Sequence, residues 1–340
     1  MLDERKAAIL RAVVEEYIDT AQPVGSAHVV RAPGVHVSSA TVRNDMATLE
    51  QEGYLRQPHT SAGRIPTEKG YRFFVDNLGQ PAALRGSDAH QVRSFFEQAH
   101  GELEQMLQDT SRLLGDLTSY AGVVVGPAPT EATLRSVQIV SLGPSSMLVV
   151  AVLSNGAVEK HQLDLAEAGA ALADGVGEER VAAATAHLAA QLSGSVRTNL
   201  PPLPVTGDTA TDALCELAVA SLRSAHGEGP DQVFVGGTAK IARAFDALET
   251  VREVLGILEE QYVVVTLLRD VLDRGLQVAI GTETGMAPLA ECALIVAPYQ
   301  AEGEPAGTIG VLGPARMDYP QAMAAVAVVG RRLSQRLTDG

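Results

Sequence analysis

The residues best suited to hydrogen-bond a ligand lie on one short segment that is predicted to be helical. Arg43 and Asn44 lie among small alanines, whereas the apolar side chains recur at helical spacing and form the face expected to be buried: Val42, Met46 and Leu49. An asparagine amide can pair bidentately with adenine, and a guanidinium can bind guanine or a phosphate. The open face of this segment therefore carries the residue types needed to hydrogen-bond to DNA bases.

Hydroxyl groups gather at the start of the same helix. Ser38 is the expected N-cap, Ser39 and Thr41 follow in the first turn, and Thr48 flanks the open face further along. Hydroxyls and free N–H groups at a helix N-terminus suit a phosphate. Taken alone, the segment also fits a simpler interpretation, in which Ser38 is only a cap and a solvated face is formed by Arg43, Asp45 and Glu50.

A basic hairpin follows this helix directly. Residues 53–66 contain two short strand-like runs around a polar, glycine-containing turn, which is typical of a hairpin. Basic and histidine side chains cluster between Gly53 and Phe74 against the single acid Glu68: Arg56, His59, Arg64, Lys69 and Arg72. Solvation alone explains such a cluster poorly, so the helix and the hairpin together predict a winged helix-turn-helix domain over residues 1–78 that binds DNA.

The predicted DNA contacts divide by role. Arg43 and Asn44 are expected to contact bases or to lie close to them. The other expected contacts position the DNA backbone, flank the open face or add positive charge near it: Ser39, Thr41, Thr48, His59, Ser61, Arg64 and Arg72. No cofactor and no metal is expected at this site.

Charge is distributed unevenly along the 340-residue chain, whose formal net charge is −15. Residues 1–78 hold 9 Lys/Arg and 10 Asp/Glu, so the rest holds 17 and 31, and the two parts carry net charges of −1 and −14. An acidic body repels nucleic acid at long range. Only the N-terminal domain is therefore a credible DNA contact.

The composition bounds the class of protein. No apolar run is long enough to span a bilayer, and the charged start lacks the apolar stretch of a secretory signal, so we expect a cytoplasmic protein without a membrane partner. Only two cysteines are present, Cys215 and Cys292, outside any metal-binding spacing. They are expected to be buried apolar residues rather than reactive thiols.

The order of expected elements predicts an α+β multidomain fold. Strand-like runs at 136–142, 147–153 and 158–163 precede an Ala/Leu-rich helical stretch from about 166 to 226. Later elements are a closing helix at 317–337 and further strand-like runs at 233–235, 262–267, 277–280, 293–296 and 308–312. A sheet that stops near 163 and resumes near 277 predicts one α+β domain interrupted by a mostly helical insertion.

Apolar residues from Val92 to Tyr120 alternate at spacings of four and three. Such a seven-residue repeat fits a helix packed along another helix, as in a dimer seam. It fits equally a helix that lies on the sheet of its own domain. The sequence leaves both interpretations open.

Motifs of catalysis are absent from the sequence. It contains no P-loop, no HExxH and no GxSxG, and strands and turns explain the Gly-rich stretch at 303–313 better than phosphate binding does. An enzyme with a DNA-binding head is therefore disfavoured. A regulator that senses a small molecule stays open as the alternative to a repressor.

Several strings together resemble the HrcA family of heat-inducible transcription repressors. The most specific string is 59–67, His-Thr-Ser-Ala-Gly-Arg-Ile-Pro-Thr, followed by Gly70-Tyr71-Arg72. The likeness continues, over essentially the full chain, in the segments 21–26, 39–46, 52–55, 234–238, 281–283 and 307–319. Residues 281–285, Gly-Thr-Glu-Thr-Gly, depart from the run that is usual in the family.

The resemblance implies a winged-helix domain, a GAF-like domain and an inserted dimerisation domain. On this basis the domains are expected at residues 1–78 (winged helix), 88–165 and 263–340 (two parts of the GAF-like domain) and 166–262 (insert). It further implies a homodimer that represses chaperone operons through an inverted-repeat operator on double-stranded DNA, with assistance from the chaperonin GroEL. Release on heat stress is expected to follow loss of order in the acidic body.

Overall fold

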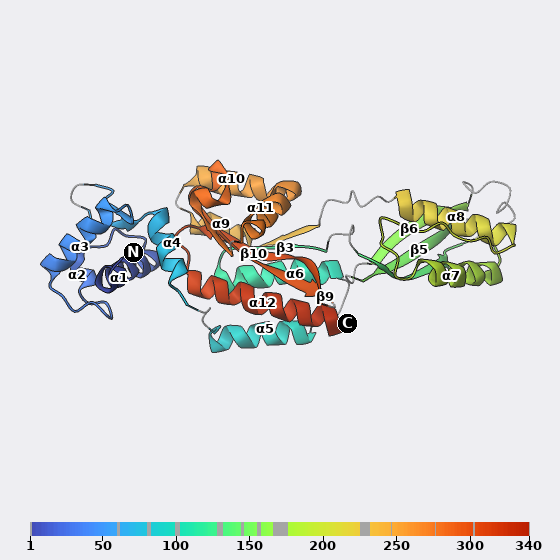
Figure 1. Cartoon of the computed structure of the whole chain (residues 1–340), viewed down its shortest axis with the longest axis horizontal. Coiled ribbons are helices and arrows are strands. Elements are labelled where there is room, and N and C mark those ends of the chain that lie inside the picture. The colour runs from blue at the N-terminus through green and yellow to red at the C-terminus, as the bar shows by residue number, and fades with distance from the viewer. Residues whose placement is uncertain are drawn as a thin grey trace.

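Three parts follow one another along the long axis of the molecule (Figure 1). The computed structural model describes residues 2–59, 62–79, 83–98, 103–127, 132–143, 146–154, 158–165, 176–224, 232–245, 247–275, 277–301 and 303–339. We call residues 2–78 the head, residues 86–125 with 233–339 the body, and the described residues between 132 and 224 the insert. The head lies at one end, the body in the middle and the insert at the other end.

Helices and one short hairpin build the head. Its elements are α1 (Glu4–Thr20), α2 (Ser26–Val29), α3 (Ser39–Gln51), β1 (Leu55–Arg56), β2 (Ile65–Pro66) and α4 (Glu68–Asp76). Side chains cap the three longer helices, because Asp3, Ser38 and Thr67 each accept a hydrogen bond from a backbone N–H of the first turn. The chain leaves α3 through Gly53, whose φ of 78° favours glycine. The predicted N-cap at Ser38 is thus confirmed.

The body is an antiparallel sheet between two helical layers. Its five strands run in the order β7 (Val233–Gly236), β3 (Ala121–Val125), β10 (Glu304–Pro314), β9 (Cys292–Ala301) and β8 (Val278–Ile280). One face packs against α6 (Leu103–Thr118) and α12 (Tyr319–Asp339), and α5 (Gly86–Gln98) packs on α12. The other face packs against α9 (Thr238–Ala244), α10 (Leu248–Glu259) and α11 (Gln261–Asp273). Successive residues of β3 serve alternate layers, as the two-residue period of a strand requires.

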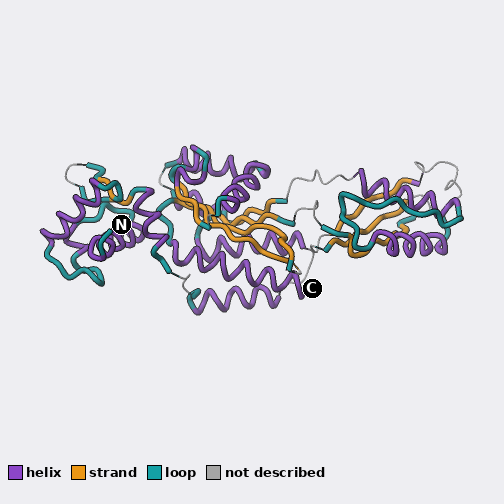
Figure 2. The backbone as a smooth tube through the Cα atoms, viewed as in Figure 1, coloured by secondary structure: helices purple, strands orange, loops and turns teal. Residues whose placement is uncertain are grey.

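The insert has a sheet and a core of its own. Its elements are β4 (Leu134–Ser141), β5 (Ser146–Leu153), β6 (Val158–Asp164), α7 (Glu178–Leu192) and α8 (Thr209–Ser224). The three strands pair antiparallel with one another and bury an apolar cluster against the two helices. The chain leaves the body after β3 and returns at β7, and these two strands are neighbours in the body sheet (Figure 2).

The mixed α/β architecture with antiparallel sheets is confirmed, but two assignments differ from the sequence prediction. The strands at 134–164 were expected in the sheet that resumes near 277, whereas they belong to the insert, and the body sheet instead takes β7. Residues 262–267 were expected to form a strand. They lie in α11, because their apolar residues continue at helical spacing to Val271 and pack on the sheet.

The seven-residue repeat from Val92 to Tyr120 covers two helices, α5 and α6. The apolar side of α6 packs on the body sheet and beside α12. Within the described residues α6 matches the second of the two open interpretations, a helix that lies on its own domain's sheet, whereas α5 packs against α12. None of the described helices is long and apolar enough to cross a membrane.

Candidate nucleic-acid interface

The helix α3 is fixed in the head from both its buried face and its start. Val42, Met46 and Leu49 are almost fully buried, as the helical spacing predicts. Asp45 is buried beside them and accepts hydrogen bonds from the Arg5 guanidinium of α1, at 2.9 Å from Nε. Because this pair ties α3 to α1, the opposite face of α3 is held outward in a single orientation.

Arg43 and Asn44 lie on that outward face and are exposed. Within the described ranges, neither side chain forms a hydrogen bond or an ion pair with the rest of the chain. Thr48 donates its hydroxyl to the carbonyl oxygen of Asn44 at 3.1 Å, which leaves the amide of Asn44 unoccupied. The two side chains predicted to contact bases are therefore open donors on a rigid helix.

Hydroxyl groups surround the N-terminus of α3. The Ser38 hydroxyl lies 3.0 Å from that of Thr41 and accepts the Thr41 N–H. The Ser39 hydroxyl lies 3.1 Å from that of Ser26, the first residue of α2. The start of α2 thus meets the start of α3, and their hydroxyls form one exposed polar edge.

The hairpin is joined to the same edge of the head. Val24 and Arg64 exchange two backbone hydrogen bonds, each of 2.9 Å, in an isolated bridge between the turn before α2 and the hairpin. Gly63 makes this bridge possible, because a Cβ there would collide with the carbonyl of Val24. A cleft of about 290 Å³ lies between the start of α2, the helix α3 and the hairpin, and is lined by Ser26, Arg43 and Gly63, among others.

Arg64 has a structural role that its sequence position does not reveal. Its guanidinium binds the Glu50 carboxylate of α3, with Nη2 at 2.8 Å and Nε at 3.1 Å from Oε2. Its side chain is only 18% exposed. Arg64 therefore holds the hairpin against α3. His59 is exposed on the hairpin, and Ser61 lies outside the described residues.

Arg72 is a correction to the predicted site. Its guanidinium donates to Glu283 at 2.9 Å from Nε and to the carbonyl oxygen of Val278 at 2.7 Å from Nη2. Both acceptors belong to the body, on the side of α4 that faces β8. Because these bonds occupy the guanidinium, Arg72 does not lie with Arg43 and the hairpin.

Arg56 belongs to the exposed basic surface, although the sequence did not single it out as a contact. It is the outward residue of β1, next to the buried Leu55. In the part of the chain that the structure describes, it forms no hydrogen bond and no ion pair. Strand alternation could have predicted this, because Leu55 is apolar and its neighbour Arg56 then points outward. Lys69, another residue of the basic cluster, is instead bound through its ammonium to the Glu52 carbonyl oxygen.

The cysteines and the carboxylates provide no chemical centre in the described residues. Burial raises the pKa of Cys215 to about 11 and that of Cys292 to about 12, which keeps both thiols protonated at neutral pH. Both are buried, as predicted. Among the described residues, no His, Cys, Asp and Glu side chains group as a metal ion would require.

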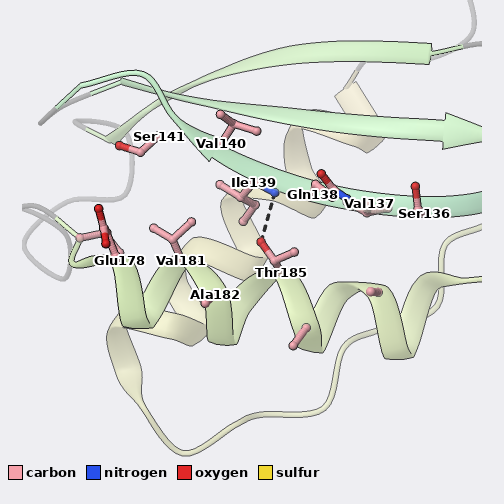
Figure 3. Close-up of a pocket in the computed structure, with 13 residues that line it drawn as sticks. Ser136, Val137, Gln138, Ile139, Val140, Ser141, Glu178, Val181, Ala182 and Thr185 are labelled. Atoms are coloured by element: carbon pink, nitrogen blue, oxygen red, sulfur yellow. Dashed lines mark hydrogen bonds between the residues drawn. The ribbon is translucent and has the colours of Figure 1, made fainter.

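A larger hollow lies in the insert, between β4 and α7 (Figure 3). It measures about 670 Å³ and is lined mostly by small and apolar residues, with hydroxyls at its sides. The Thr185 hydroxyl of α7 accepts the Ile139 N–H of β4 at 3.2 Å and so satisfies a donor at the outer edge of that strand. No charged cluster of the described residues converges on this groove.

Comparison with known proteins places the chain in a family. A family model described as "HrcA protein C terminal domain" matches residues 104–323. The heat-inducible transcription repressor HrcA of Streptomyces avermitilis is 37% identical over 349 residues, and the alignment covers 100% of both chains. That of Listeria monocytogenes is 35% identical over 346 residues, covering 99% of this chain and 98% of its own. The chain belongs to the HrcA family.

The resemblance noted in the sequence is thereby confirmed. HrcA proteins are heat-inducible transcription repressors, so the chain is a transcription regulator and not an enzyme. A solved crystal structure described as a hypothetical protein shares the fold, with a TM-score of 0.70 and 23% identity, over 100% of this chain and 99% of that chain. The similarity to HrcA spans the head, the body and the insert alike.

Proposed function

We propose that this chain represses heat-shock chaperone operons by binding an inverted-repeat operator as a homodimer. The head acts as a winged helix-turn-helix, in which α3 enters the major groove and the hairpin is the wing. The proposal rests mainly on the exposed side chains of Arg43 and Asn44. They lie on the outward face of α3, which the bond between Arg5 and Asp45 holds in one orientation. Base recognition needs donors that are free and fixed in place.

Roles follow from the bonds that each side chain already makes. Arg43 and Asn44 contact base edges or the adjacent phosphates, and the hydroxyls of Ser39 and Thr41 bind a phosphate at the start of α3. Further backbone contacts come from Thr48, His59, Ser61 and, beyond the sequence-based set, Arg56. Arg64 supports the wing through Glu50 and acts on DNA indirectly.

The family resemblance supports the assignment of the other two parts. The body is GAF-like and comprises residues 86–125 and 233–339, and the insert at 132–224 contributes to the dimer. Heat stress releases the repressor by loosening the acidic body and insert, and GroEL assists recovery of the binding form. We propose these bounds in place of those expected from the sequence, since β4, β5 and β6 pair with one another and β7 pairs with β3.

A gel-shift experiment tests the proposal. Duplexes selected by the pure chain from a randomised library are expected to contain an inverted repeat. The shift on that duplex is expected to weaken with rising temperature and to recover when the chaperonin is present. Selection that enriches no inverted repeat, or no common sequence at all, would contradict the proposed function.

A further inference from the structure

The head is joined to the body by a small polar cluster and an aromatic contact. We call the polar cluster the latch, which comprises Arg72 and Glu68 of α4 with Glu283 and Thr282 of the body. Arg72 binds the Glu283 carboxylate with two of its nitrogens and also the Val278 carbonyl oxygen at 2.7 Å. Glu68 accepts the Thr282 hydroxyl at 2.6 Å and the Thr282 N–H at 3.3 Å.

The body side of the latch is shaped to receive α4. Residues Gly281–Thr284 form a single 3-10 turn after β8, and the Ile280 N–H donates to the Glu283 carboxylate at 2.9 Å. Gly281 has a φ of 54°, and a Cβ there would collide with the carboxylate of Glu68. Glycine is thus required both for the turn and for the close approach of α4.

Burial and charge keep the latch engaged at neutral pH. Partial burial acts to raise the pKa of Glu283, but hydrogen bonds from Arg72 and from the Ile280 N–H more than offset it and lower the pKa below the ordinary 4.5. The Arg72 side chain is less than a quarter exposed. A guanidinium that binds a carboxylate with two nitrogens fixes an angle as well as a distance.

An aromatic contact between the head and the body lies beside the latch. Tyr319, at the start of α12, is fully buried, with its ring centroid 6.0 Å from that of Tyr71 and 6.4 Å from that of Phe74. Ring packing of this kind holds the two parts together through apolar surface. The directional bonds of the latch add a constraint on the angle between the two parts, because modest interfaces between domains permit relative motion.

We propose that Arg72 and Glu283, supported by Glu68 and Thr282, are positioning residues that set the angle of the head on the body. This inference rests on the proposed function, since the angle matters only if two heads of a dimer must reach two half-sites together. Binding of the second head is then an intramolecular event, whose effective concentration depends on whether the geometry matches the spacing. The latch therefore determines which half-site spacing the repressor accepts, without any contact to DNA.

The test uses the full chain and duplexes selected by the wild-type protein. Three probes are compared at one temperature: the selected inverted repeat, the same repeat with altered spacers, and a duplex with a single half-site. The variant is Glu283→Ala, because Glu283 belongs to the body. Glu253→Ala is the matched control, since it removes an exposed carboxylate of α10.

Glu283→Ala is expected to weaken binding to the inverted repeat by about tenfold or more. It should leave half-site binding unchanged and flatten the dependence on spacer length. Arg72→Ala should behave in the same way, and the double variant should be no worse than either single variant. Glu253→Ala should match the wild type throughout.

Two results would overturn the inference. One is unchanged affinity and unchanged spacer preference in both latch variants. The other is an equal loss on the single half-site and the inverted repeat, which would mean that the residues act through the fold of the head or through direct DNA contact. If the wild-type chain selects no inverted repeat, the proposed function itself fails, and this outcome is distinct from both.

Discussion

Arg72 and Glu283 lie 211 positions apart in the sequence and form a two-nitrogen ion pair between α4 and the turn after β8. The sequence places Arg72 in a basic cluster, which favours a DNA contact. The structure assigns it to the connection between head and body instead. Positive charge close to α3 therefore does not by itself identify a DNA contact, and the bonding partners of each side chain decide its role.

The latch predicts a defined pH dependence of stability. The pKa of Glu283 is lowered in the folded chain, so its contribution to the free energy of unfolding is fully present above the ordinary value of 4.5 and is lost as the pH falls through the folded pKa. The difference in Tm between wild type and Glu283→Gln should therefore be constant near neutral pH and should shrink below pH 4.5. Thermal denaturation across this range measures it, and a difference that persists undiminished in acid would contradict the assigned cause.

Gly63→Ala should damage the hairpin. The added Cβ would meet the carbonyl of Val24 and push apart the bridge that joins the hairpin to the turn before α2. We expect a loss of about 1–3 kcal/mol in stability and weaker operator binding, because overpacking forces the backbone to move. Gly256→Ala is the control: nothing lies within 4 Å of its Cβ and it stands inside α10, so it should be neutral or stabilising. Equal behaviour of the two variants in a denaturation experiment would count against this role of Gly63.

Two arginines of the head should differ in their effect on salt dependence. Arg56→Ala removes an exposed cation of the hairpin, and the slope of log affinity against log salt should become shallower by about 0.9, the value for one phosphate contact. Arg72→Ala should leave the slope on a single half-site unchanged, because its guanidinium is bound to the body. Arg112→Ala on α6 provides a charge-matched control far along the chain. A shallower slope for Arg72→Ala on a single half-site would contradict this prediction and indicate that Arg72 contacts DNA.

The positions of most helices and strands could be predicted from the sequence, whereas the elements with which each of them pairs or packs could not. Helical spacing predicted the buried face of α3, and the strand-like runs between 136 and 163 predicted the positions of β4, β5 and β6, since both patterns are local. The pairing of β3 with β7 depends on residues more than a hundred positions apart. The run from Val263 to Thr266 is rich in β-branched residues, which favour strands, yet tertiary packing places it in α11.

The candidate site shows the same division. Sequence reasoning correctly predicted that Arg43 and Asn44 are exposed, because their exposure follows from the buried face of the same helix. It could not find that Glu50 occupies Arg64, or that Asp45 is buried against Arg5, since these pairs join separate elements. Asp45 in particular belonged to the solvated face in the simpler interpretation, and its burial removes that possibility.

The cysteines should be inert in the folded chain. Burial raises the pKa of Cys215 to about 11 and that of Cys292 to about 12, so the reactive thiolate is scarce at neutral pH and access is blocked. Ellman's reagent should therefore label neither thiol in the native protein and both after unfolding. Rapid labelling of the native chain at neutral pH would show that one of the two thiols is accessible.

The most direct measurement of the central claim is the ratio of operator affinity to random-duplex affinity for the wild type and for Asn44→Ala. Asn199→Ala, an exposed asparagine of the insert, serves as the matched control. If the open face of α3 reads bases, Asn44→Ala lowers the ratio by about 1–3 kcal/mol, roughly five- to 150-fold, at unchanged Tm, and the control leaves it intact. A ratio that is the same in all three proteins would contradict the assignment of α3 as the recognition helix.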